Sequence, residues 1–193
     1  MSSATTFRDL AGIPPATATT KDSVLVIIDA QNEYANGALA VSNLSTSRPA
    51  ISSLLQRYRS SGGKIIHVLH TVPESTPVFT PGTQLAEEFD ELRPVDGEQV
   101  IRKKFPGSFA ETELEEVVRG SGLSKLVLVG YMAHVCVSTT AREGHQKGFE
   151  VLLPEDAIGD RDIPGHSGAQ VTQMVMSELG DFFGTVVQSN EIK

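Results

Sequence analysis

Three residue types in this 193-residue chain could together carry out hydrolysis through a covalent intermediate. Cys136 is the one cysteine, Asp29 follows an apolar run, and Lys103 stands in a basic pair with Lys104. A cysteine thiolate attacks carbonyl carbons, and nearby cations and helix N-termini favour the thiolate. A carboxylate can take the thiol proton and pass it to a leaving amine. Because a lone cysteine is more often a small buried hydrophobe, its surroundings must decide between the two interpretations.

The elements that position these residues follow from the alternation of apolar runs with helical patterns. Short β-branched runs indicate buried strands, and apolar positions three and four residues apart indicate helices. Strands are expected at 23–28, 64–69, 99–102, 125–129, 149–153 and 184–187, and helices at about 47–61, 112–120, 135–147 and 168–179, the last capped by Ser167. This alternation predicts a three-layer α/β/α sandwich with a largely parallel six-stranded sheet.

The carboxyl ends of parallel strands meet at one edge of a sheet, where ligands bind in such folds. Asp29 directly follows the first expected strand and His70 the second, and Lys103 follows the third. Cys136 lies shortly after the strand at 125–129, at the start of the next helix. The predicted topology therefore brings the chemically useful residues to one edge, which favours a catalytic role for the cysteine.

Length and charge limit the kinds of function that the chain can have. Its length suits one compact domain, expected at 21–193 after a loosely ordered lead-in at 1–20. The net charge of -8 argues against nucleic-acid and anionic-membrane partners, but not against a small anionic substrate. The apolar runs are too short to span a bilayer, and the first twenty residues lack the apolar core of a signal peptide. We expect a cytoplasmic protein, with unconventional secretion left open.

Three segments of the sequence, in order, carry a resemblance to a known superfamily. They are 27–34 (IIDAQNEY), 102–118 (RKKFPGSFAETELEEVV) and 130–157 (GYMAHVCVSTTAREGHQKGFEVLLPEDA), and the likeness runs from about 23 to 187. On these residues the chain resembles the isochorismatase-like cysteine hydrolases, which include nicotinamidases, N-carbamoylsarcosine amidohydrolases and isochorismatases. The resemblance implies their Rossmann-like hydrolase fold and an Asp-Lys-Cys triad at Asp29, Lys103 and Cys136.

Two further details come from the resemblance. Members of the superfamily place the lysine six residues before the Phe of an S-A-F segment, and counting back from Phe109 favours Lys103 over Lys104. They also have a cis peptide bond before the nucleophile turn, which implies one between Tyr131 and Met132. The backbone N–H groups of Met132 and Cys136 are then the implied oxyanion donors.

The departures from the resemblance concern the metal site of nicotinamidases. That site uses an Asp-x-His element shortly after the catalytic Asp, and no histidine stands between Ala30 and Ser60. His67 and His70 fall on one expected strand at an odd spacing, so they point to opposite faces. We therefore expect no metal and no cofactor. Because isochorismatases often lack the cysteine, Cys136 favours C–N hydrolysis.

Other side chains could line the pocket or compete for a role. His134 suggests a Cys–His pair, although the resemblance assigns the base to Asp29. The composition of segment 71–98 is equally typical of a binding loop and of a solvent-exposed surface loop. Pocket residues are expected among an amide and several aromatic side chains: Gln31, Tyr34, His70, Phe79, Phe105 and Tyr131.

The sequence thus predicts a hydrolase that cleaves an amide-type C–N bond of a small molecule through a thioester on Cys136. In this scheme Asp29 is the acid and base and Lys103 supplies electrostatic support. One alternative is vinyl-ether hydrolysis of isochorismate, with Asp29 as general acid. Another is a non-catalytic binding module on the same fold. The resemblance also implies a homodimer or homotetramer.

Overall fold

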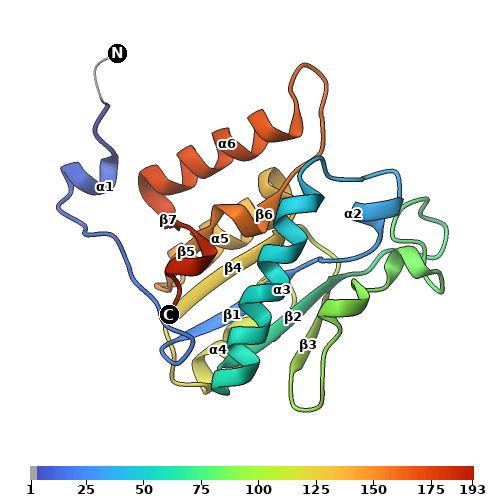
Figure 1. Ribbon diagram of the computed structural model, residues 1–193, viewed down its shortest axis with the longest axis horizontal. Helices are drawn as coiled ribbons and strands as arrows, with labels where there is room; N and C mark the ends of the chain where they lie inside the picture. Colours follow the sequence, from blue (N-terminus) through green and yellow to red (C-terminus); the bar gives the residue numbers. More distant parts are fainter. Residues whose placement is uncertain (1–3) are drawn as a thin grey trace.

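A parallel β-sheet crosses the centre of the protein in the computed structural model, which describes residues 4–193 (Figure 1). The strands lie in the order β3-β2-β1-β4-β5-β7, with β6 paired to the end of β4, and all pairs are parallel. Their bounds are β1 Ser23–Ile28, β2 Lys64–His70, β3 Gln99–Lys103, β4 Lys125–Tyr131, β5 Glu150–Pro154, β6 Ile158–Gly159 and β7 Thr185–Val187. The parallel sandwich expected from the sequence is present, with a seventh strand added.

The additional strand, β6, contains only two residues. A 3-10 turn at Glu155–Ala157 redirects the chain after β5, so that Ile158 and Gly159 pair with Gly130 and Tyr131 of β4. Two residues carry no readable alternation, which is why the sequence pattern predicts six strands. The pairing matters for the site because Asp160, which follows β6, is thereby placed beside the segment that leads to Cys136.

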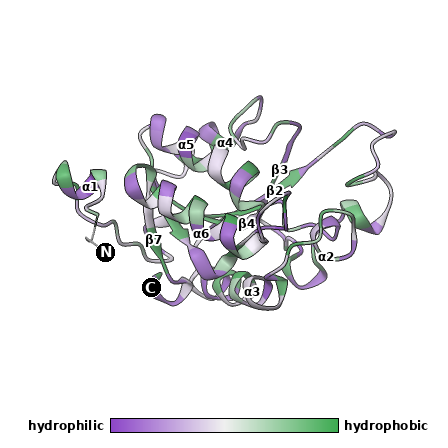
Figure 2. Cartoon of the chain, turned by 90° about the horizontal axis from the view of Figure 1, so that it is seen from above, coloured by the Kyte–Doolittle hydropathy of each residue, from purple (hydrophilic) through white to green (hydrophobic). Residues whose placement is uncertain are grey.

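Helices cover both faces of the sheet, as Figures 1 and 2 show together. Helix α3 packs on one face, and α4, α5 and α6 pack on the other. The helices are α1 Phe7–Leu10, α2 Glu33–Asn36, α3 Leu44–Ser61, α4 Leu114–Gly120, α5 Ser138–Gln146 and α6 Gly168–Glu178, with π-helical turns at Ala133–Val137 and Leu179–Phe183. Shorter 3-10 turns lie at Gln84–Ala86, Asp90–Leu92, Glu155–Ala157 and Ser189–Glu191.

Two apolar layers hold these elements together. The strand β1 is buried at all six positions, because its side chains alternate between the two layers. Figure 2 shows the hydrophobic residues concentrated along the strands and on the inner sides of the helices. A continuous apolar run of this kind is what a strand covered on both faces requires. The central strands are therefore a rigid base for the residues at their ends.

Three helix starts differ from the sequence prediction. Helix α5 begins at Ser138, after the π-helical turn Ala133–Val137, rather than at about 135. Helix α3 begins at Leu44, three residues before Ser47, and contains Pro49 within its length. Helix α4 begins at Leu114 rather than Thr112, because the Thr112 hydroxyl donates to the Ser108 carbonyl instead of forming a capping box. The cap at Ser167 is confirmed: its hydroxyl accepts the N–H of Gln170, whose side chain bonds back to the Ser167 N–H.

The N-terminal segment differs from the loosely ordered lead-in expected for 1–20, of which 1–3 lie outside the described residues. Ala16 and Ala18 are buried, and the Lys193 N–H donates to the Ala18 carbonyl at 3.1 Å. Helix α1 also contacts the domain, because the Phe7 N–H donates to Asp181 at 2.9 Å and the Phe7 ring packs edge-to-face on Phe182 at 4.8 Å. The last residues before β1 therefore form part of the domain. Among residues 4–193, no helix is long and apolar enough to cross a membrane.

Candidate active site

The three triad residues predicted from the sequence come together at the carboxyl edge of the sheet. Asp29 follows β1, Lys103 ends β3, and Cys136 lies in the π-helical turn after β4. The Lys103 Nζ atom is 2.7 Å from Asp29 Oδ2, and both side chains are fully buried. Lys104 is exposed on the outside of the same segment. The structure thus places Lys103, and not its neighbour, in the site.

The Lys103 ammonium is held from several directions. Burial alone lowers a lysine pKa, but the Asp29 charge and the hydrogen bonds of Lys103 to Asp29 and Cys136 outweigh burial and raise the pKa of Lys103. Its Nζ atom also donates to the Phe105 carbonyl at 3.2 Å and lies 3.4 Å from His70 Nδ1. Burial and the Lys103 charge lower the pKa of His70, so its ring is neutral near pH 7. Lys103 is therefore a fixed positive charge in the site.

Asp29 sits on a sharp turn that aims its carboxylate into the protein. Its φ of 50° is in the left-handed region, which Asp tolerates better than most residues. Its N–H donates to the Val68 carbonyl at 2.8 Å, and its own carbonyl accepts the Gln31 N–H at 2.7 Å. Its Oδ1 atom is buried and accepts no hydrogen bond within the described part of the chain. That oxygen is thus available to take a proton.

The Cys136 side chain is 5% exposed and lies among core residues of the α5 side. Burial and the Asp29 charge raise the pKa of Cys136 to about 12, and Lys103 offsets only part of this rise. Burial and the Asp29 charge thus outweigh the nearby cation and the helix start, which by themselves favour a thiolate. Because a carboxylate lies close and water is excluded, the proton stays on sulfur.

The backbone around Cys136 has the form that the resemblance implies. The peptide bond between Tyr131 and Met132 is cis. The Met132 carbonyl then accepts two N–H groups, from Val135 at 3.2 Å and from Val137 at 3.1 Å, which closes the turn. The expected oxyanion donors, the N–H groups of Met132 and Cys136, belong to this one turn.

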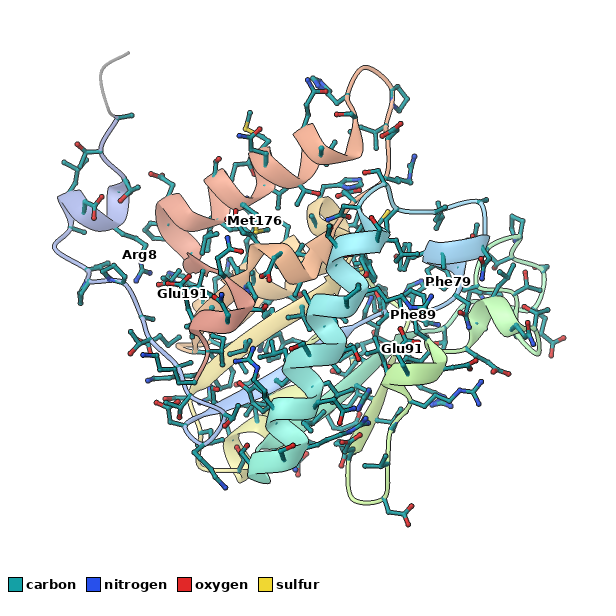
Figure 3. All side chains as sticks on the ribbon, in the orientation of Figure 1. Arg8, Phe79, Phe89, Glu91, Met176 and Glu191 are labelled. Carbon is teal, nitrogen blue, oxygen red and sulfur yellow. The ribbon has the colours of Figure 1, made fainter. Side chains whose placement is uncertain are left out.

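Three of the expected pocket residues form an aromatic group beside the triad. The Phe79 ring lies 5.2 Å from Tyr34 and 5.2 Å from His70, with edge-to-face geometry in both pairs. Tyr34 and Phe79 are buried and His70 is partly buried. The pKa of Tyr34 is raised well above its usual value by burial and by Asp29 and Cys136, which places its phenol near the triad. Figure 3 shows Phe79 and Phe89 on the side of the molecule where α2 lies.

The other expected pocket residues have different surroundings. Phe105 is 43% exposed, at the rim beside Lys103. Tyr131 is fully buried, and its hydroxyl bonds to Ser47 of α3 at 2.9 Å, so its polar atom faces away from the triad. The Gln31 amide donates to the His70 and Ala86 carbonyls and accepts the His70 N–H. The Gln31 side chain thus braces the ends of β1 and β2 against the segment 71–98, and its substrate contact stays a prediction.

The segment 71–98 is anchored to the domain and is not a solvated excursion. Gln31 and Glu88 pair as an isolated bridge, and the Phe89 N–H donates to the Ala30 carbonyl. The fully buried His67 ring bonds to Glu88 at 2.9 Å and to Glu98 at 3.0 Å. A cavity of about 360 Å³ lies under its first half, between His70, Phe79 and Ala86. This segment therefore covers the site, with its second half fastened more firmly than its first.

The histidines near the site do not form the alternatives considered for them. His67 bonds to Glu88 and Glu98 while His70 lies beside Lys103, as expected for opposite faces of one strand. Within residues 4–193, no three His, Cys, Asp or Glu side chains are gathered as metal ligands are. The His134 ring bonds through Nδ1 to Asp160 at 2.7 Å, so its partner is a carboxylate and not Cys136.

Sequence reasoning missed two buried acids next to the site. Asp160 bonds to His134, and Glu33 accepts the N–H groups of Phe79 at 3.1 Å and Leu39 at 3.2 Å. Both are fully buried. A buried carboxylate is indistinguishable from a surface one in sequence, because the N–H donors that bond to it come from other segments of the chain. The only available signal was the position of Glu33 within the first signature block.

Comparisons with known proteins agree with this geometry. Residues 23–191 match the family model described as "Isochorismatase domain". The chain is 58% identical over 186 residues to a Verticillium dahliae protein named a secreted isochorismatase effector, covering 96% of this chain and 98% of that one. It superposes with a TM-score of 0.94 on an isochorismatase from Pseudomonas putida, at 34% identity, covering 98% and 100% of the two chains.

A third similarity is to an N-carbamoylsarcosine amidase from Thermoplasma acidophilum. The TM-score is 0.77 at 25% identity, covering 89% of this chain and 99% of that one. The similar proteins therefore include one named as an amidase as well as those named as isochorismatases. The family model covers nearly the whole domain, and Asp29, Lys103 and Cys136 all lie within it. The chain belongs to the isochorismatase family of hydrolases.

Proposed function

We propose that this hydrolase cleaves a C–N bond of a small amide through a thioester on Cys136. The observation that carries the proposal is the buried Cys136 side chain at the same edge of the sheet as the 2.7 Å ion pair of Asp29 and Lys103. The carboxylate of this pair is a base, and burial raises the pKa of the Cys136 thiol, so the thiol holds a proton that the carboxylate can take. Because the thiol loses its proton only when substrate is bound, the resting enzyme carries no reactive thiolate that could undergo side reactions.

The reaction proceeds in two halves. Asp29 takes the Cys136 proton while the sulfur adds to the amide carbonyl, and the N–H groups of Met132 and Cys136 receive the oxyanion. The intermediate collapses with loss of the C–N bond, and the amine leaves with the proton held by Asp29. Water then attacks the thioester, giving one proton to Asp29, and the C–S bond breaks as sulfur regains that proton. Lys103 stabilises each anionic state.

A second candidate is supported by the name of the Verticillium relative, which is 58% identical to this chain. In vinyl-ether hydrolysis of isochorismate, a proton is added to the methylene carbon, and water then adds to the resulting cation to release pyruvate. Asp29 must carry a proton to act as the general acid. The Cys136 thiol is one source of that proton within the site, so a Cys136→Ala variant informs on both routes.

Intact mass spectrometry after incubation with a panel of amides and activated esters tests the first route. An acyl adduct on Cys136 is expected in wild type and absent in Cys136→Ala. In parallel, ammonia release from the amides is compared with pyruvate release from isochorismate. A Cys136→Ala variant that keeps full activity would falsify the covalent route. Pyruvate release without any adduct transfers the assignment to the second candidate.

Two properties around the activity are also proposed. The name of the Verticillium relative favours export of this chain, against the cytoplasmic location expected from the sequence. Immunoblots of culture medium and cells, with an abundant cytosolic enzyme as leakage control, decide between the two.

The sequence resemblance supports a homodimer or homotetramer. Light scattering on the purified protein measures the mass directly, and a single species of 20.7 kDa contradicts this proposal.

A further inference from the structure

The nucleophile turn depends on an acceptor from outside itself. The first N–H groups of any helix lack partners within it, and here the turn at Ala133–Val137 continues into α5. Its second residue, His134, donates its N–H to Asp160 Oδ2 at 2.9 Å, and its ring Nδ1 approaches the same oxygen at 2.7 Å. One carboxylate oxygen therefore holds both the backbone and the side chain of the turn.

Asp160 is itself fixed on every side. Its side chain is fully buried, and its other carboxylate oxygen accepts the Arg161 N–H at 2.8 Å. Its carbonyl accepts the N–H and the hydroxyl of Ser42, at 2.9 and 3.1 Å. The pairing of β6 with Gly130 and Tyr131 places Asp160 beside the cis peptide bond between Tyr131 and Met132. The acceptor is thus rigid, which an anchor must be.

The backbone around Asp160 is packed too closely for any adjustment. A methyl group on Gly159 would meet Asn43 at 2.2 Å, and one on Gly168 would meet the Asp160 carbonyl at 2.4 Å. These contacts join the segment after β6 to the start of α3 and to the start of α6. The position of the carboxylate is therefore set by three elements that converge on it, and not by a flexible loop.

The carboxylate also suits its place electrostatically. A negative charge at the start of a helix is stabilised by the helix dipole and by the free N–H groups there. With Nδ1 bonded to a carboxylate, the half-buried His134 ring is held in one orientation and serves as part of the anchor.

We propose that Asp160 is a positioning residue, whose buried carboxylate clamps the His134 end of the nucleophile turn and so aims the oxyanion-donating N–H groups of Met132 and Cys136. This inference rests on the proposed function for the role of those donors. Misplacing such donors by about 1 Å can cost about 100-fold in rate, because the oxyanion exists only in the transition state. Loss of the clamp therefore slows acyl transfer and leaves thiol access unchanged.

Two reagents separate donor placement from thiol reactivity. Acetylation of Cys136 by 4-nitrophenyl acetate passes through an oxyanion, whereas alkylation by iodoacetamide is a direct displacement without one. We expect Asp160→Ala to slow acetylation at least 10-fold and to keep alkylation within threefold of wild type. Asp160→Asn, which keeps one acceptor oxygen, should lie between. His134→Ala keeps the backbone bond to Asp160 and should lose less than threefold.

The matched control is Asp156→Ala, since Asp156 accepts the N–H and hydroxyl of Ser189 at 2.7 and 2.6 Å in a different turn. It should leave both reagent rates at wild-type values. Acetylation within threefold of wild type in both Asp160 variants overturns the proposal. So does an equal loss of acetylation and alkylation, or a His134→Ala loss as large as that of Asp160→Ala, because the effect then lies on the thiol or the imidazole.

Amide hydrogen exchange keeps the clamp testable apart from the activity. Asp160→Ala should speed exchange in segment 131–138, and Asp156→Ala should leave that segment unchanged. If wild-type Cys136 is not acetylated at all, the proposed function fails, and the exchange rates alone decide on the clamp. Faster exchange in 131–138 then supports it, and unchanged exchange overturns it.

Discussion

Lys103 and Asp29 form a 2.7 Å ion pair although strand β2 lies between the strands that carry them. Neighbouring strands are about 4.8 Å apart, so the two backbones are separated by about 10 Å. A lysine is long enough to reach across this distance, and burial removes the water that would otherwise screen the pair. The ion pair therefore links the carboxyl ends of β1 and β3 across the end of β2.

Replacing Lys103 should damage both stability and activity. In Lys103→Met, the buried Asp29 carboxylate loses its partner, and breaking a buried pair in this way costs about 3–5 kcal/mol. The exposed Lys104 is the matched control, so Lys104→Met should leave both quantities near wild type. Urea unfolding measures the free energy, and the acyl-adduct assay measures the chemistry. A Lys103→Met protein as stable as Lys104→Met contradicts this account of the pair.

The alkylation rate of Cys136 should keep rising with pH above the range in which an ordinary thiol loses its proton. The thiol pKa is raised from 9.0 to about 12 by burial and by Asp29, so the folded protein holds its proton where a free thiol has lost it. Iodoacetamide should therefore label Cys136 more slowly than free cysteine at pH 7, with a rate that still climbs above pH 9. A rate that levels off below pH 9 contradicts the raised pKa.

The same shift links Cys136 to stability at high pH. Between 9.0 and about 12 the unfolded chain releases the thiol proton and the folded protein keeps it. The folded state binds more protons, so the free energy of unfolding falls as pH rises through this window. Below pH 9 the stabilisation is fully present. Cys136→Ala should remove this part of the slope, which urea titrations at several pH values measure.

Acid should loosen the anchor of segment 71–98. Burial raises the pKa of Glu98, but bonds from Arg59, the Val95 N–H and His67 outweigh it and lower that pKa to about 2. The resulting stabilisation is present above pH 4.5 and is lost as pH falls toward 2, because the unfolded state then binds the proton first. Glu98→Gln should remove this fall in the free energy of unfolding between pH 4.5 and 2, which urea titrations at several pH values measure. The exposed Glu74→Gln should leave it unchanged.

Gly130 at the end of β4 should tolerate no side chain. Its φ of 114° is outside the range of L side chains, and a methyl group would lie 2.0 Å from the Ile28 carbonyl of β1. Backbone strain and overpacking each cost about 1–3 kcal/mol, so Gly130→Ala should lose both amounts in unfolding free energy. Gly120→Ala, where the space is open, is the control and should be neutral or slightly stabilising. Equal stability of the two variants contradicts the close packing of β1 and β4.

Much of the fold could be predicted because local patterns carry it. The central strands β1 and β4 are apolar runs buried on both faces, and the Gly62 stop and the Ser167 cap act within a few residues. Element ends were less predictable, since the Thr112 hydroxyl has a competing acceptor at Ser108 that no local pattern reveals. Strand β6 is too short to leave a periodic signal.

The triad could also be predicted, from residue type, the parallel direction of the strands and the signature blocks. By itself, the sequence determined which residues reach the carboxyl edge of the sheet, because alternating strands and helices make the strands parallel, and the carboxyl ends of parallel strands lie at one edge. Only the tertiary structure decided their state. Burial next to Asp29 keeps the Cys136 thiol protonated. The Gln31 amide forms hydrogen bonds with backbone groups. The buried carboxylates of Asp160 and Glu33 accept hydrogen bonds that hold the neighbouring segments in place. Desolvation and hydrogen bonding depend on atoms from distant segments, and those distances exist only once the chain has folded.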